Sequence, residues 1–98
     1  MMLFCFMKKA ARFVVQGTVQ GIFFRQFVKG HADELKLRGF VRNLESGDCE
    51  VVVEGEKESI DRLLEFVKKG PEHAQIRNVV VEEMKWSGDF ENFKVLRF

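Results

Sequence analysis

The sequence predicts an α+β fold in which two helices cover one face of an antiparallel sheet. Two segments place apolar residues at helical spacing, and short runs rich in β-branched residues lie before, between and after them. The order along the chain is β-α-β-β-α-β, with a short final strand. We expect a single domain, because 98 residues suffice for one core.

The first strand and the first helix meet at a turn bracketed by glycines. Residues 12–16 are rich in strand-forming side chains, and the turn follows at 17–21. Helical spacing then runs from Ile22 to Arg38, and Gly39 is predicted to end the helix after a basic last turn. One face of this helix carries Phe24, Phe27, Val28, His31, Ala32 and Leu35.

The middle of the chain has the spacing of a β-hairpin. Strands are predicted at 40–44 and 49–54, on either side of the turn residues 45–48. Side chains of the second strand alternate between two faces of the sheet. We therefore expect the face that carries Glu50 and Glu54 to be more hydrated than the opposite face.

The second helix has the clearest pattern in the chain. Acidic residues in its N-terminal half and lysines at its end suit the helix dipole. Gly70-Pro71 is a typical signal for the end of a helix. Two further strands are predicted, one around Val79–Val81 and one over 93–98, joined through a turn that begins at Trp86. The helix buries an apolar stripe made of Ile60, Leu63, Leu64 and Val67. The whole is a ferredoxin-like α+β sandwich, a fold that hosts many functions and therefore decides none by itself.

Composition limits the classes of partner. The chain is 46% apolar and 32% charged, which is typical of a folded domain, and its formal net charge is only +1. Such a charge gives no global field for binding nucleic acid or an anionic membrane, so we expect neither partner. Any anion site must be local.

Cysteine and histidine residues match no metal-binding spacing. Cys5 and Cys49 are far apart in the sequence, and His31 and His73 are single and distant from both. We expect two free thiols in a reducing cytosol, hence a cytoplasmic protein without a metal ion or other cofactor.

Residues 1–7 are predicted to be an N-terminal extension, with the domain spanning 8–98. The apolar run at the start precedes the positive charges instead of following them, and it is too short for a secretory signal or a spanning helix. Met7 is therefore an alternative start of the chain.

The segment from Gly17 to Arg25 has the features of an anion site. A strand ends there, a glycine-bracketed turn follows and a helix begins, so unpaired backbone N–H groups converge at the junction. Gly21 permits the positive φ of an anion-binding nest, and Arg25 in the first helical turn can reach the same anion with its planar fork. A tight turn followed by a solvated arginine is the alternative interpretation.

Asn43 is the second candidate residue. It lies near the end of the second predicted strand, and its neutral amide offers a donor and an acceptor that can orient a water molecule. On spacing alone, a turn-forming asparagine is the simpler explanation.

Together the two segments resemble the acylphosphatase family. The family signature is Gly-x-Val-x-Gly-Val-x-Phe-Arg, followed by Gly-[Phe/Trp]-Val-x-Asn before a hairpin that contains glycine. Ile22 stands where Val is usual, and the resemblance extends from about Lys8 to Phe98. The matching positions are Gly17, Val19, Gly21, Phe24 and Arg25, and then Gly39, Phe40, Val41 and Asn43.

The resemblance implies an enzyme that hydrolyses small acyl phosphates to carboxylate and inorganic phosphate. It implies catalytic roles for Arg25, which grips the phosphate, and for Asn43, which places the attacking water. A carboxylate is a good leaving group, so such an enzyme needs no metal and no covalent nucleophile; it must hold the phosphoryl oxygens and place a water in line. We expect a monomer that inorganic phosphate inhibits. The implied phosphate cradle is the backbone of Gln20, Gly21, Ile22, Phe23 and Phe24.

Three alternatives remain in view. An RNA-binding module shares the fold, and Arg38-Gly39-Phe40 is similar to the start of a base-stacking motif, but the next residues do not continue it. A catalytically silent anion-binding domain is a second alternative, against which the intact Arg25 and Asn43 argue. The third is the acylphosphatase-like domain of a larger maturation protein, against which the short length argues.

Overall fold

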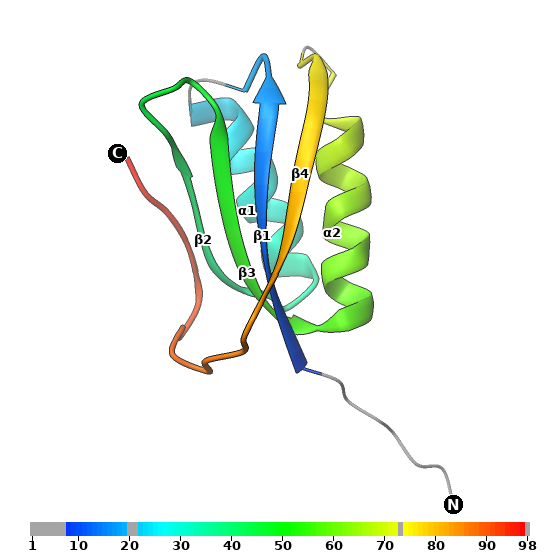
Figure 1. Cartoon of the computed structure of the whole chain (residues 1–98), viewed down its shortest axis with the longest axis vertical. Helices are drawn as coiled ribbons and strands as arrows, with labels where there is room; N and C mark the ends of the chain where they lie inside the picture. Colours follow the sequence, from blue (N-terminus) through cyan, green and yellow to red (C-terminus); the bar gives the residue numbers. More distant parts are fainter. Residues whose placement is uncertain (1–7, 20–21, 73, 98) are drawn as a thin grey trace, which may run out of the picture.

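A computed structural model describes residues 8–19, 22–72 and 74–97. Five strands form one sheet in the order β4-β1-β3-β2-β5, and both helices lie on the same face of it (Figure 1). All neighbouring strands are antiparallel except β2 and β5, which are parallel. This architecture confirms the predicted fold class. The elements are β1 Lys8–Gly17, α1 Ile22–Glu34, β2 Arg38–Asn43, β3 Cys49–Glu56, α2 Lys57–Lys69, β4 Ile76–Met84 and β5 Phe93–Val95.

The core lies between the helices and the sheet. Phe13 on β1 is paired with Val51 on β3 and with Val81 on β4, so alternate side chains of these strands face the helices. From the other layer, α1 buries Phe24, Val28 and Ala32. Of the stripe predicted for the second helix, Ile60, Leu63 and Val67 are buried and Leu64 is partly buried against the core. Among the described residues, no helix is long and apolar enough to cross a membrane.

The first helix ends earlier than its sequence pattern predicts. It stops at Glu34, and the Leu37 N–H donates to the Ala32 carbonyl oxygen over 2.9 Å. Lys36 takes the left-handed conformation at φ 59°, which glycine usually takes after a helix. The prediction that Gly39 ends this helix was therefore wrong.

Gly39 belongs instead to β2, where the close approach of β3 requires a residue without a side chain. Its φ is 140°, and a Cβ added there would lie 1.9 Å from the Val52 carbonyl oxygen on β3. No side chain fits at that distance, so glycine allows β2 to lie against β3 at this point.

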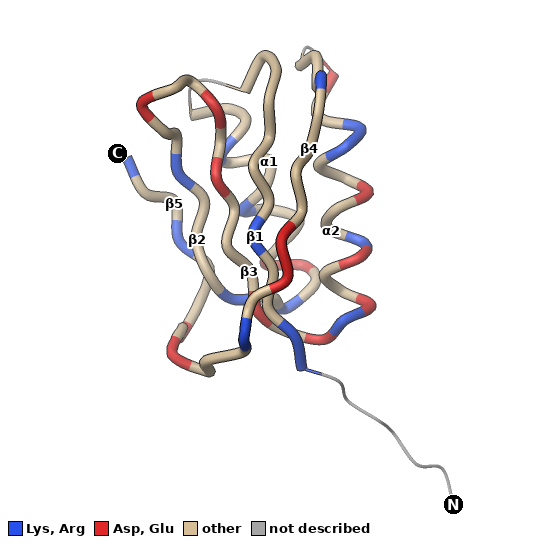
Figure 2. The backbone as a smooth tube through the Cα atoms, viewed as in Figure 1, with Lys and Arg blue, Asp and Glu red and all other residues tan. Residues whose placement is uncertain are grey.

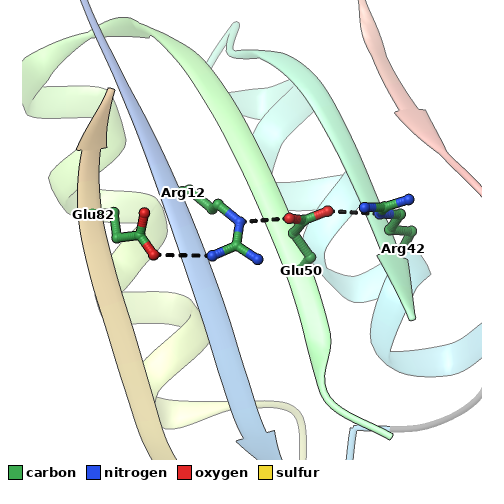
Figure 3. Close-up of polar contacts among 4 residues, drawn as sticks. All are labelled: Arg12, Arg42, Glu50 and Glu82. Atoms are coloured by element: carbon green, nitrogen blue, oxygen red, sulfur yellow. Dashed lines mark hydrogen bonds and ion pairs between the residues drawn. The ribbon is translucent and has the colours of Figure 1, made fainter. Parts of the chain in front are cut away.

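The prediction that the Glu50 and Glu54 face of β3 is more hydrated than the opposite face was also wrong. Every residue from Cys49 to Glu54 is buried, and Glu50 and Glu54 are each only 5% exposed. Glu50 lies within an ion-pair chain across four strands, which Figure 3 shows as Glu82, Arg12, Glu50 and Arg42. Glu54 accepts hydrogen bonds from the Ser87 N–H and hydroxyl and from the Gly88 N–H. Long side chains and a loop therefore replace water on this face.

Candidate active site

The turn after β1 is fixed on the strand side by Gly17. Its φ is 142°, and a Cβ there would lie 2.0 Å from the Gln75 carbonyl oxygen. The neighbouring Thr18 N–H donates to the same oxygen over 2.8 Å, and Val19 is fully buried in the core. The close approach of Gly17 to Gln75 and the burial of Val19 together hold the start of the turn against the sheet.

The helix side of the turn begins at Ile22. Phe24 is buried in the core, whereas Ile22 is 38% and Phe23 is 88% exposed. The first N–H groups of a helix have no partner within it, so the backbone of these three residues is suited to an anion. Gln20 and Gly21, the other two residues predicted for the phosphate cradle, lie outside the described residues.

Arg25 is tethered to the C-terminal segment. Its Nη1 donates to the Leu96 carbonyl oxygen over 2.9 Å, in a partly buried position. The Leu96 N–H in turn donates to the Val41 carbonyl oxygen on β2 over 2.8 Å. Two hydrogen bonds thus link the guanidinium to the strand that ends at Asn43.

Asn43 is the last residue of β2, directly opposite Cys49 on β3. It has the same strand parity as Val41, so its side chain faces the helix layer, on the side from which Arg25 comes. The Asn43 Oδ1 atom is buried and has no hydrogen-bond partner among the residues that the structure describes. A buried acceptor without a partner costs about 1–3 kcal/mol, so this atom is suited to receive a hydrogen bond from a bound molecule.

Cys49 links the two candidate residues electrostatically. Burial raises the pKa of its thiol to about 12, while the charge of Arg25 lowers that pKa and Glu50 raises it. The thiol is therefore neutral at physiological pH. Because Arg25 acts on the cross-strand partner of Asn43, the arginine and the asparagine belong to the same end of the sheet.

The opposite face of the same strands is held by charge pairs. Arg42 and Glu50 neighbour Asn43 and Cys49 in the sequence and point to the helix-free side (Figure 3). Burial alone would raise the pKa of Glu50, but hydrogen bonds from Arg12 and Arg42 outweigh it and hold the pKa below its usual value. Ion pairs on the helix-free face of the sheet thus hold the strand ends that carry Asn43 and Cys49.

The described residues form a further cleft but no candidate metal site. Within residues 8–19, 22–72 and 74–97, no group of three His, Cys, Asp or Glu side chains could hold a metal ion. A cleft of about 520 Å³ lies at the opposite end of the sheet, between Lys8, Arg38 and Gly55. Neither Arg25 nor Asn43 lines it. Its cations are matched by glutamates, so we assign it no role.

Two contributors to the site were missed in the sequence. The pairing of Cys49 with Asn43 could have been found, because a hairpin around 44–48 places 43 opposite 49. The tether from Arg25 to the Leu96 carbonyl could not, because it joins a side chain to a backbone oxygen 71 positions away.

Comparisons of the sequence with known proteins give one family. A family model described as Acylphosphatase matches residues 11–95. An acylphosphatase of Methylococcus capsulatus is 43% identical over 89 residues, which cover 91% of this chain and 97% of that protein. One from Alkalilimnicola ehrlichii is 41% identical over 90 residues, covering 92% of this chain and all of that protein.

Solved structures give the same result. An acylphosphatase from Coxiella burnetii matches with a TM-score of 0.85 and 42% identity, covering 91% of this chain and 93% of that one. The acylphosphatase from Bacillus subtilis also has a TM-score of 0.85, with 32% identity and coverage of 92% and 99%. Fold, sequence and length agree, and the chain belongs to the acylphosphatase family.

Proposed function

We propose that this chain hydrolyses the carboxyl–phosphate anhydride of small acyl phosphates, yielding a carboxylate and inorganic phosphate. Arg25 and the backbone N–H groups of residues 20–24 hold the phosphoryl group, and Asn43 orients the water that attacks it. The observation that carries the proposal is the buried, unpartnered Oδ1 of Asn43, at the same end of the sheet as the tethered Arg25.

The attacking water would satisfy the unpartnered acceptor. A water that donates a hydrogen bond to the Asn43 Oδ1 keeps a lone pair for attack on phosphorus. A neutral amide does this without adding negative charge beside the phosphoryl oxygens, which a carboxylate would repel. We assign no general base, because loss of a carboxylate already makes the anhydride reactive.

Arg25 would bind the phosphoryl group throughout the reaction. Guanidinium is planar and carries five N–H donors, a geometry that matches phosphate oxygens. The bond to the Leu96 carbonyl supports this role, because it orients the plane before substrate arrives. The backbone at the start of α1 would add neutral donors and the positive end of the helix dipole.

The same chemistry requires no metal ion and no second chain. Every group named lies within one chain, so we propose that a monomer is catalytically complete and works in the cytoplasm, with inorganic phosphate as product and inhibitor. Asp48 and Glu45 in the hairpin turn are partly or fully exposed and receive no role.

The proposal is tested by hydrolysis of benzoyl phosphate and acetyl phosphate in metal-free buffer. We expect saturable turnover of both, with competitive inhibition by inorganic phosphate. Binding of phosphate without turnover of either compound would favour the catalytically silent anion-binding alternative.

A further inference from the structure

Phe23 is the most exposed large apolar side chain among the described residues. It is 88% exposed, whereas the other exposed large apolar side chains lie between 38% and 45%. A single exposed apolar residue is common on protein surfaces and needs no function by itself. Phe23 differs in its position, because its backbone N–H belongs to the cradle proposed for the phosphoryl group. Its side chain therefore starts beside the bound substrate.

The Phe23 side chain lies on the flank of α1 that faces α2. Residues four apart share one side of a helix, so Phe23 continues the line of Phe27 and His31 toward the N-terminus of α1. The rings of Phe27 and His31 are in edge contact with centroids 4.7 Å apart, and His31 stacks on Phe66 of α2 at 3.8 Å. Phe27 and His31 are half-buried, whereas Phe23, one turn further, is open to solvent.

Arg25 lies on the opposite flank of the same helix. Two residues correspond to about 200° of rotation around an α-helix, and the Arg25 guanidinium donates to the Leu96 carbonyl oxygen beside β2. Both side chains start in the first turn of α1, where Cα–Cβ bonds tilt toward the N-terminus. Phe23 and Arg25 therefore stand on either side of the helix end to which the phosphoryl group is assigned.

The direction of the proposed reaction brings the acyl group to the Phe23 flank. In an in-line displacement the leaving oxygen departs on the side of phosphorus opposite to the attacking water. The proposed water is held by Asn43 at the end of β2, and Arg25 is tethered on that side through Leu96. The departing carboxylate and its acyl group would therefore extend away from β2, toward the flank of α1 that carries Phe23.

We propose that Phe23 contacts the acyl group of the substrate and gives the enzyme a preference for acyl phosphates whose acyl group is aromatic or bulky and apolar. This inference rests on the proposed function, because it requires turnover at this site. The Phe23 ring is covered by water in the free protein, and an apolar acyl group that lies against it removes both surfaces from water. An acetyl group offers only one methyl for such a contact, so it gains little.

The ratio of kcat/KM for benzoyl phosphate to kcat/KM for acetyl phosphate tests this preference. Comparison of that ratio between variants cancels the intrinsic reactivity of each compound and any effect of the substitution that both substrates share. Phe23→Ala should lower the ratio about 3-fold to 10-fold, which corresponds to the loss of one aromatic contact. Phe23→Leu keeps an apolar side chain and should give an intermediate ratio, whereas Phe23→Trp should keep the ratio at least as high as in the unmodified chain.

Trp86→Ala is the matched control, because it removes an exposed aromatic ring far from the site. Trp86 is 43% exposed and follows β4 in the segment that leads to β5, at the end of the molecule away from the start of α1 (Figure 2). It should leave the ratio unchanged, and circular dichroism checks that each variant is folded. An unchanged ratio in Phe23→Ala, or an equal loss in Trp86→Ala, would overturn the role of Phe23 and leave the proposed hydrolysis intact. An unmodified chain that hydrolyses neither compound would instead overturn the proposed function, and this inference with it.

Discussion

At the scale of single residues, the account depends on a tethered arginine and an unsatisfied amide oxygen. Neither residue is unusual in type, and the role proposed for each follows from the groups that surround it. The Leu96 carbonyl fixes the Arg25 guanidinium, and the Cys49 thiol beside Asn43 stays neutral because burial raises its pKa to about 12. Among the described residues, the proposed site therefore combines the positive charge of Arg25 with neutral dipoles, an arrangement that suits a phosphoryl group.

Replacement of Asn43 should affect turnover far more than binding. An interaction realised mainly in the transition state changes kcat. Asn43→Ala should lose about 100-fold to 1,000-fold in kcat, with nearly normal inhibition by phosphate. Asn43→Asp should also fail, since its carboxylate repels the phosphoryl oxygens. Asn92→Ala, at an exposed asparagine, is the matched control. If folded Asn43→Ala kept most of its kcat, another group would place the water.

Replacement of Arg25 should affect binding and turnover together. Arg25→Lys keeps the charge but loses the planar fork, so neither kcat nor inhibition by phosphate should recover to normal. Arg25→Ala should lose inhibition by phosphate as well as turnover, which a phosphate titration of the initial rate measures. Arg62→Lys on the exposed face of α2 should change neither. Unaltered phosphate affinity in Arg25→Ala would contradict the assigned role.

At the scale of elements, the sequence pattern predicts those helices and strands that are determined by contacts between residues near one another in the sequence. The amphipathic stripe of α2 and the spacing of the β2–β3 hairpin could be predicted because each depends on neighbouring residues. The end of α1 could not, because Lys36 occupies a left-handed position that glycine normally fills. Burial of both faces of β3 could not, because besides Arg42 across the hairpin it depends on Arg12 and on the loop at Ser87, which are remote in the sequence.

Two glycines give a paired test of the turn to which the phosphate cradle is assigned by prediction. Gly17→Ala adds a Cβ 2.0 Å from the Gln75 carbonyl oxygen at a φ that alanine avoids. We expect it to lower the free energy of unfolding by more than about 1 kcal/mol and to weaken phosphate inhibition. Gly30→Ala on α1 meets no atom within 4 Å and should raise stability by about 0.5–1 kcal/mol. Urea unfolding measures both, and equal stability of the two variants would refute the role of Gly17.

The ion-pair chain across β4, β1, β3 and β2 should make stability depend on pH. The pKa of Glu50 is lower in the folded chain than in the unfolded chain, so its contribution is full above about pH 4.3 and is lost as pH falls through the folded value. Glu50→Gln should therefore cost about 1–3 kcal/mol at neutral pH, and the difference should shrink in acid. Glu65→Gln, which is exposed, should show no such effect. A cost that did not change with pH would show that packing, and not charge, explains the burial of Glu50.

At the scale of the whole molecule, residues 8–97 contain every described group of the site. A chain that starts at Met7 should therefore keep its kcat and KM, as a comparison of the two purified forms would show. A shortened chain that is folded but inactive would place part of the site in the first six residues.

Dialysis against a chelator should leave activity unchanged, because in the proposed mechanism Arg25 and backbone N–H groups balance the phosphoryl charge. Recovery of activity only after addition of zinc or magnesium would contradict that account.

The central claim is that water attacks phosphorus while the anhydride oxygen leaves with the carboxylate. Hydrolysis of benzoyl phosphate in ¹⁸O-enriched water, followed by mass spectrometry of both products, tests it most directly. We predict that the label enters inorganic phosphate and that the benzoate carries none. Label in the benzoate would show attack on the carbonyl carbon, and would contradict a site in which Arg25 holds the phosphoryl group for water placed by Asn43.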